Sequence, residues 1–146
     1  MRLNKGSYLL LIKIKKPVKI KTGFLGLIYF DRGHYVYVGS AMNNLQKRVK
    51  RHLDSSNLEK GQEKKHWHID YLLSNDNVKI IEVYYKESEI KEECLMAKKV
   101  KRESFHKIKG FGSSDCKCKS HLFKINYDRL DVFKKGFNNM KLLYFR

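Results

Sequence analysis

An alternating strand that runs through a glycine into a basic helix, at residues 34–53, most limits what this chain can fold into. The segment HYVYVGSAMNNLQKRVKRHL begins with apolar side chains at every second position, which is the period of a β-strand. Its second half places Leu45, Val49 and Leu53 on one helical stripe, at about 100° per residue. This change of period predicts a strand that is followed at once by a helix beside the sheet.

Strands and helices along the rest of the chain follow an order typical of an α+β fold. The turn signal Asp31-Arg32-Gly33 separates two apolar runs, so 24–39 is interpreted as a β-hairpin. Predicted strands cover 7–15, 24–30, 34–39, 78–85 and 121–127. Predicted helices cover 43–53 with Asn43 or Asn44 as its N-cap, 66–74, and 89–105 with Ser88 as its N-cap. Loops are predicted at 54–65 and 110–120, and 129–146 stays ambiguous. We expect one domain, residues 1–146, with a small, mainly antiparallel sheet flanked by helices.

The charge of the chain favours a polyanionic partner. Its 32 Lys and Arg residues against 15 Asp and Glu residues give a formal net charge of +17. Nucleic acid is the expected partner class, because each neutralised phosphate releases counterions. A solvated basic surface without a partner is the plainer alternative. A membrane is not expected, since the longest apolar run, 8–12, is too short to cross a bilayer.

The predicted basic helix places cationic side chains in two environments. Arg48 and His52 lie one turn apart at the border of the apolar stripe, and we expect both to be half-buried and to point into a cleft. A guanidinium there can clamp a phosphate, and an imidazole can move a proton near neutral pH. The opposite face is expected to be exposed and to bind nucleic acid through Lys47, Lys50 and Arg51. An ordinary basic helix with solvated charges is the alternative.

A carboxylate on an apolar helix face is a second unusual feature. Glu93 is predicted to project within the face formed by Ile90, Cys94, Ala97 and Val100, without a helical ion-pair partner. Glu92 is predicted to face solvent. A carboxylate in such a place needs an arginine, a hydroxyl or a divalent cation, and Mg²⁺ commonly binds through one or two carboxylates with water and phosphate. A buried glutamate that is hydrogen-bonded to a tyrosine is the alternative.

A cysteine–histidine pattern lies in the glycine-containing loop near the C-terminus. Cys116, Cys118 and His121, with Asp115 beside them, have the spacing Cys-x-Cys-x-x-His. Zinc can use two thiolates and an imidazole, but the spacing is unlike that of common zinc modules and the fourth ligand is undefined, so zinc is not expected. A structural loop packed at the cleft is favoured, and a redox-sensitive dithiol is the third option. The odd count of three cysteines favours a reducing, cytoplasmic location.

A histidine-rich segment precedes the second half of the chain. In His66-x-His68-x-Asp70, His66 and Asp70 share a helical face. Either they join the site from its rim, or they form a satisfied hydrogen-bonded pair behind Trp67.

Taken together, these residues resemble the GIY-YIG nuclease superfamily. Gly6-Ser7-Tyr8 resembles the Gly-x-Tyr strand that opens this family, and Tyr37-Val38-Gly39 resembles its Tyr-Ile/Val-Gly strand. The Arg and His of the next helix correspond to Arg48 and His52, and the Glu of a later helix corresponds to Glu93. Over nearly its whole length the chain resembles an uncharacterised branch of that superfamily, whose members occur alone or fused to endonuclease III-like repair proteins. The segments that carry this second resemblance are Gly26, 33–41, 66–73, 93–94, 110–116, Cys118 and 120–123.

The resemblance implies a metal-dependent DNA endonuclease, with DNA repair as a possible setting. Tyr8 and Tyr37 would face a cleft from adjacent strands, and Tyr8, assisted by His52, would activate the attacking water. Arg48 would bind the scissile phosphate, and Glu93 would hold one Mg²⁺ or Mn²⁺ ion. Branched, damaged or single-stranded DNA is the implied substrate, a repair glycosylase is a further implied partner, and no small-molecule substrate is expected. The alternative on the same fold is a non-catalytic module that binds nucleic acid or a repair partner.

Overall fold

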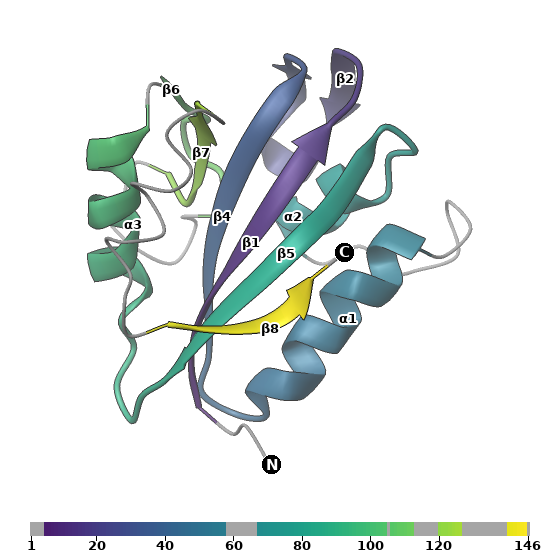
Figure 1. Cartoon of the computed structure of the whole chain (residues 1–146). Coiled ribbons are helices and arrows are strands. Elements are labelled where there is room, and N and C mark those ends of the chain that lie inside the picture. Colours follow the sequence, from purple (N-terminus) through teal and green to yellow (C-terminus); the bar gives the residue numbers. More distant parts are fainter. Residues whose placement is uncertain (1–4, 58–66, 105, 113–119, 127–139, 146) are drawn as a thin grey trace.

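The chain is described by a computed structural model, which covers residues 5–57, 67–104, 106–112, 120–126 and 140–145 (Figure 1). The strands are β1 (Gly6–Ile14), β2 (Val18–Lys21), β3 (Leu27–Phe30), β4 (Gly33–Ala41), β5 (Val78–Glu87), β6 (His106–Lys107), β7 (Leu122–Ile125) and β8 (Lys141–Phe145). The helices are α1 (Leu45–Asn57), α2 (His68–Leu73), α3 (Glu93–Glu103) and the short 3₁₀ turn η1 (Gly23–Leu25). Within these ranges, the strands form an antiparallel six-stranded sheet in the order β6-β7-β4-β1-β5-β8 and a two-stranded sheet of β2 and β3. The predicted α+β class with a mainly antiparallel sheet is confirmed.

Strand β1 lies at the centre of the large sheet because both of its faces are apolar. It pairs with β4 on one side and β5 on the other. Tyr8, Leu10 and Ile12 contribute to one core, which α1 and α2 cover, whereas Leu9 and Leu11 contribute to a second core, which α3 covers. An uninterrupted apolar run is typical of a strand that is buried on both faces. The sheet is therefore a middle layer between helices, as Figure 1 shows.

The predicted β-hairpin at 24–39 is wrong. Strand β3 pairs with β2, which was not predicted from the sequence, and β4 pairs instead with β1 and β7. The first part of the strand predicted at 24–30 is the turn η1, in which Gly23 and Gly26 have positive φ angles of 52° and 76°. These two glycines reverse the chain between β2 and β3, so β3 pairs with β2. Both edges of β4 are then available for β1 and β7 in the large sheet.

The helix boundaries differ from the predictions where short polar residues lie. Asn44 accepts a hydrogen bond of 3.0 Å from the backbone N–H of Lys47, which confirms it as the N-cap of α1, but the helix runs on to Asn57 into the predicted loop. Helix α3 begins at Glu93 and not at 89, because Ser88 Oγ bonds the backbone N–H and carbonyl of Ile90 and so holds a non-helical turn.

The remaining predicted elements are largely present. Helix α2 lies within the segment predicted at 66–74, and β7 lies within the segment predicted at 121–127. Strand β5 covers the segment predicted at 78–85, and β8 is part of the C-terminal segment that the sequence left ambiguous. None of the helices in the described ranges is long and apolar enough to span a bilayer.

Candidate active site

A pocket of about 420 Å³ lies where β1 begins and β4 ends, beside the first turns of α1 and α3. All of the residues predicted to be catalytic or to bind metal line this pocket. They are Tyr8, Tyr37, Arg48, His52 and Glu93. The sheet and two helices therefore bring together side chains that are distant in the sequence.

Tyr8 and His52 form the polar centre of the pocket. The Tyr8 hydroxyl and Nε2 of His52 share a hydrogen bond of 2.7 Å. Tyr8 is 1% exposed and His52 is 1% exposed, so the prediction that His52 is half-buried is wrong. The rings of Tyr8, Tyr37 and Trp67 lie 5.4, 6.3 and 6.3 Å from the imidazole and close it off from solvent. Nδ1 of His52 has no hydrogen-bond partner among the residues that the structure describes.

Gly39 makes room for the Tyr8 ring. The two residues are opposite each other in the β1–β4 register, and a Cβ on Gly39 would lie 2.3 Å from Cζ of Tyr8. Any side chain at this position would displace the ring. Gly39, which lies within β4, is thus needed because the ring of Tyr8 on the neighbouring strand approaches closely, and not because its φ angle is positive.

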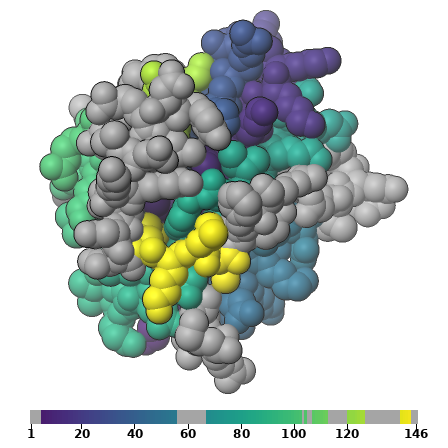
Figure 2. Space-filling model, viewed as in Figure 1, coloured from purple at the N-terminus to yellow at the C-terminus, as the bar shows by residue number. Residues whose placement is uncertain are grey.

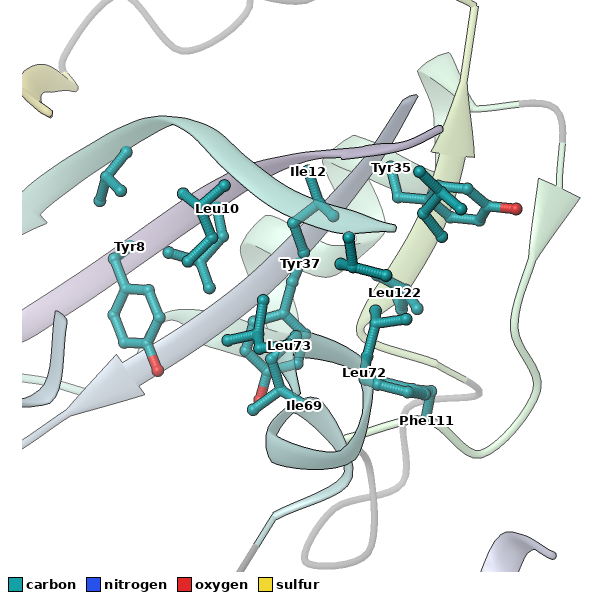
Figure 3. Packing of buried hydrophobic residues seen from close by; sticks show 14 of the residues in the cluster. Tyr8, Leu10, Ile12, Tyr35, Tyr37, Ile69, Leu72, Leu73, Phe111 and Leu122 are labelled. Atoms are coloured by element: carbon teal, nitrogen blue, oxygen red, sulfur yellow. The ribbon is translucent and has the colours of Figure 1, made fainter. Parts of the chain in front are cut away.

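Tyr37 projects from β4 to the same face of the sheet as Tyr8, as Figure 3 shows. The two ring centroids lie 6.5 Å apart. Gly112, which has a φ angle of 71°, passes close to the Tyr37 ring and lines the pocket. The aromatic rings of Tyr8 and Tyr37 and the backbone at Gly112 therefore all contribute to the pocket lining.

Arg48 is half-buried in the pocket wall, as predicted. Its Nη1 donates a hydrogen bond of 3.2 Å to the carbonyl oxygen of Ser40, and its Cζ lies 4.4 Å from the centroid of the Trp67 ring. A stacked guanidinium has little side-chain freedom left to lose, so these contacts fix the orientation of Arg48 at the pocket wall. The hydroxyl of Ser40 is buried and has no hydrogen-bond partner within the described part of the chain.

The prediction that Arg51 faces solvent is wrong. Its guanidinium donates two hydrogen bonds, of 2.9 and 3.1 Å, to the carboxylate of Asp70, and its Cζ lies 4.5 Å from the centroid of Trp67. Asp70 is 2% exposed and also accepts a hydrogen bond from the backbone N–H of Trp67. Asp70 therefore neutralises Arg51 and holds Trp67, and it is not among the residues that line the pocket. The predicted pairing of Asp70 with His66 stays untested, because His66 lies outside the described residues. On the same helix, Lys47 and Lys50 are exposed as predicted.

Glu93 brings a negative charge to the pocket, although not from the middle of a helix face. It is the first residue of α3, its side chain is 22% exposed, and Lys91 Nζ lies 3.8 Å from its Oε1. The predicted apolar face is only partly present, since Ile90 precedes the helix and is 67% exposed. Glu92 does not face solvent as predicted, because it is paired with Lys86 at 3.1 Å and is 18% exposed.

Burial favours the neutral forms of Tyr8 and His52, the hydrogen-bonded pair at the centre of the pocket. It raises the pKa of the Tyr8 hydroxyl, an effect that the Arg48 charge partly opposes and the Glu93 charge reinforces. Burial also raises the pKa of Tyr37 well above its usual value. For His52, burial lowers the pKa to about 3, and the charges of Arg48 and Arg51 act in the same direction against that of Asp70. The imidazole is thus an unprotonated base throughout the physiological pH range.

The candidates for a pocket rim and a zinc site lie elsewhere or outside the described residues. His66, Asp115, Cys116 and Cys118 are not among the residues that the structure describes. His121 is fully buried, with Nδ1 3.2 Å from the carbonyl oxygen of Val38 and Nε2 3.9 Å from Sγ of Cys94.

Trp67 is the pocket residue that sequence reasoning did not place in the site. It contacts both arginines of α1 and the ring of His52. The sequence signals were that the single tryptophan of the chain stands immediately before a short helix and that it lies in the segment 66–73, which carries part of the family resemblance. Neither signal reveals a stacking contact with Arg48 and Arg51, which come from a separate helix earlier in the chain.

Comparison with known proteins identifies a family. The family model described as "Domain of unknown function DUF123" matches residues 7–142 of the chain. No curated protein matches the chain, and no solved structure does.

Proposed function

The chain belongs to the DUF123 family, a domain family of unknown function, and we propose that it is a metal-dependent DNA endonuclease of the GIY-YIG kind. The observation that carries the proposal is the convergence of a tyrosine–histidine pair, an arginine and a glutamate on one pocket. Phosphodiester hydrolysis needs a base for the attacking water, a cation for the phosphate and a means of stabilising the leaving oxygen. The pocket supplies a residue for each of these tasks.

Tyr8 and His52 would remove the proton from the attacking water. The Tyr8 oxygen accepts that proton while its own proton passes to Nε2 of His52, along the existing 2.7 Å hydrogen bond. Because His52 is neutral, it can accept the proton without first losing one. Asp70 stabilises the imidazolium that results, since its charge acts to raise the pKa of His52.

Arg48 would bind the scissile phosphate. Its guanidinium is oriented by Trp67 and by the carbonyl oxygen of Ser40, and it lines the same pocket as Tyr8. The Ser40 hydroxyl at the pocket wall, which has no partner among the described residues, is a further donor for a phosphate oxygen. Two cationic side chains in the pocket, Arg48 and Lys91, favour an anionic ligand.

Glu93 is the residue that would hold a divalent cation. Its carboxylate lines the pocket and is partly exposed, which leaves room for the water and phosphate ligands that Mg²⁺ prefers. A bound Mg²⁺ or Mn²⁺ ion would offset negative charge on the phosphate and on the leaving oxygen. We place the reaction in a reducing, intracellular compartment, in keeping with the odd count of three cysteines.

A second candidate function is that of a nucleic-acid-binding module, which is favoured by the two cationic side chains of the pocket, Arg48 and Lys91, and by the net charge of +17. In this alternative, Arg48 and Lys91 hold a phosphate in the pocket without cleavage, and a repair protein such as a glycosylase would act on the bound DNA.

A cleavage assay distinguishes the two functions. Labelled duplex, flapped, lesion-containing and single-stranded DNA would be incubated with the protein in Mg²⁺, Mn²⁺ or EDTA. Metal-dependent cleavage that is lost in an Arg48→Ala protein purified in the same way supports the endonuclease and excludes a contaminating nuclease. Binding that weakens steeply with salt, but without cleavage of any substrate in either metal, supports the binding module instead.

A further inference from the structure

The two-stranded sheet leaves one face open, and that face is both apolar and basic. Lys19 is opposite Tyr29 and Lys21 is opposite Leu27, so these four side chains project from the same face of the β2–β3 ribbon. Leu27 is 68% and Tyr29 is 56% exposed. The other face carries Val18, Ile20 and Phe30, which are buried against the main core. The ribbon is therefore anchored on one side and presents the other side to solvent.

Phe24 projects from the tip of this ribbon. It lies in η1 and is 108% exposed, the highest value among the exposed large apolar side chains of the described residues. A phenyl ring that is fully in water is unfavourable, and an exposed apolar group that is grouped with others marks an interaction site.

The turn at the tip lies against α2 and against the segment that continues to Gly112 in the pocket lining. A Cβ on Gly23 would lie 3.6 Å from the ring of Tyr71 in α2, and a Cβ on Gly110 would lie 3.1 Å from Cδ2 of Leu25. Gly112, two residues after Gly110, lines the pocket. Phe24 is thus presented by a turn whose neighbours rest on α2 and on the segment that forms the pocket wall. In Figure 2 the end of the molecule that carries β2 projects at the top.

The chemistry of the ribbon fits nucleic acid better than a protein partner. Lysines are depleted at the centre of protein interfaces, yet here they alternate with the apolar side chains across the two strands. Within the described residues neither Lys19 nor Lys21 takes part in an ion pair. An aromatic ring beside unpaired cations is the combination that binds single-stranded nucleic acid, since the ring stacks on a base while the cations contact the backbone.

We propose that the β2–β3 ribbon is a second nucleic-acid contact, at which Phe24 stacks on an unpaired base and Lys19 and Lys21 bind the adjoining phosphates. This inference rests on the proposed function in one respect: the nucleic-acid strand that contacts the ribbon is taken to continue into the pocket. Bases within a duplex have their faces covered by neighbouring bases, so a ring at the tip of a turn stacks without an unstacking cost only on a base that is already unstacked. The substrate class is therefore DNA with unpaired nucleotides, such as a flap or a single-stranded arm.

Binding in EDTA tests the inference without cleavage. Fluorescence anisotropy would compare a single-stranded oligonucleotide, a flapped substrate and a blunt duplex. Phe24→Ala should weaken binding of the first two by about fivefold to a hundredfold, and of the duplex by less than about twofold. Leu142→Ala, which shortens a 51% exposed side chain on the edge strand β8, is the matched control and should leave all three affinities unchanged.

An abasic scan then locates the base. At the stacked nucleotide, removal of the base should abolish the effect of Phe24→Ala, because both changes remove the same contact. The variant Lys19→Ala/Lys21→Ala should lower the slope of log affinity against log salt by about 1.4 for a single strand. Lys98→Ala/Lys99→Ala removes two exposed lysines of α3, on the opposite side of the sheet, and should change this slope by less.

Three results would overturn the inference. The first is equal affinity of the parent and Phe24→Ala for unpaired DNA, and the second is a Phe24→Ala effect that no abasic position removes. The third is a change in self-association of Phe24→Ala, measured by light scattering, without a change in DNA affinity, which would make the ribbon a protein interface. The cleavage assay decides the proposed endonuclease activity, and these binding tests decide the role of the ribbon. A protein that cleaves DNA can still lack the ribbon contact, and a protein that does not cleave DNA can still have it.

Discussion

The hydroxyl of Tyr8 lies 2.7 Å from Nε2 of His52, although the two residues are 44 positions apart in the chain. Both groups are buried, and burial favours the neutral form of each. A neutral phenol that is hydrogen-bonded to a neutral imidazole can pass a proton in one direction, from water through the hydroxyl to Nε2. Arg48 and Glu93 line the same pocket as this pair, so a cation, an anion and a proton-accepting pair lie together there.

Replacing Arg48 should separate cleavage from binding. Arg48→Ala removes a charge that is placed to stabilise the transition state, so we expect a loss of about 10²–10³-fold in cleavage rate and a small change in DNA affinity. Single-turnover cleavage with labelled DNA measures the first, and anisotropy in EDTA the second. Lys98→Ala, at an exposed position of α3 that has no part in the proposed site, is the control and should retain the parental rate. A variant Arg48→Ala that still cleaves at that rate would remove the arginine from the mechanism.

Replacing Glu93 tests the metal ligand. Glu93→Gln keeps the size of the side chain but removes the charge that would hold a cation, so metal-dependent cleavage should be lost while DNA binding in EDTA is retained or tightens. Glu92→Gln is not a suitable control, because Glu92 is paired with Lys86. Glu89→Gln is suitable, since its side chain is 88% exposed and its ion pair with Lys5, at 3.5 Å, is solvent-exposed and contributes little, so it should behave as the parent does. If Glu93→Gln lowers the melting temperature and leaves the cleavage rate unchanged, the carboxylate is structural.

Adding one methyl group at Gly39 should disturb Tyr8. The Cβ of Gly39→Ala would lie 2.3 Å from Cζ of Tyr8, so we expect a loss of about 1–3 kcal/mol in the free energy of unfolding, together with loss of cleavage. Urea denaturation measures the first effect. In a Tyr8→Ala background the ring is absent, and Gly39→Ala should then cost much less. Equal costs in both backgrounds would show that the strain lies elsewhere.

Asp70 should matter for stability far more than an exposed aspartate does. Asp70→Asn leaves Arg51 without its carboxylate, and we expect a loss of about 2–3 kcal/mol in the free energy of unfolding. This is below the cost for a fully buried pair because the Arg51 side chain is 27% exposed. The control is Asp54→Asn, which breaks an exposed pair with Lys50 and should cost less than about 1 kcal/mol. Equal losses in urea denaturation would contradict the assigned role of Asp70.

The buried His52 should make stability fall in acid. Its pKa is about 3 in the folded protein against an ordinary value of 6.5, so between these pH values the unfolded chain binds one more proton at this site than the folded chain. Stability therefore rises with pH across this window and is lost as the pH falls through it, by up to several kcal/mol, at about 1.4 kcal/mol per unit. In His52→Gln this site no longer titrates, so the slope of unfolding free energy against pH should flatten. Parallel slopes for the parent and the variant would contradict the burial of a neutral imidazole.

Local patterns in the sequence were sufficient for several parts of the fold and site. The alternation in β4, the stripe of Leu45 and Val49 and the cap at Asn44 depend on residues a few positions apart, so their spacing predicts them. Helical positions selected Arg48, His52 and Glu93, and the family resemblance, which also rests on sequence alone, added Tyr8 and Tyr37 and grouped these residues as one site.

Only the tertiary structure decided which environments those residues meet. Angular position on a helix placed Arg51 toward solvent, but Asp70 and Trp67 come from another segment of the chain and enclose it. The pairing of β4 with β1 and β7 rather than with β3 likewise does not follow from the apolar runs themselves, because it joins segments that are far apart in the sequence. Periodicity states which side of an element is apolar, whereas the burial and partners of a charged side chain depend on contacts between distant segments, which only the folded chain forms.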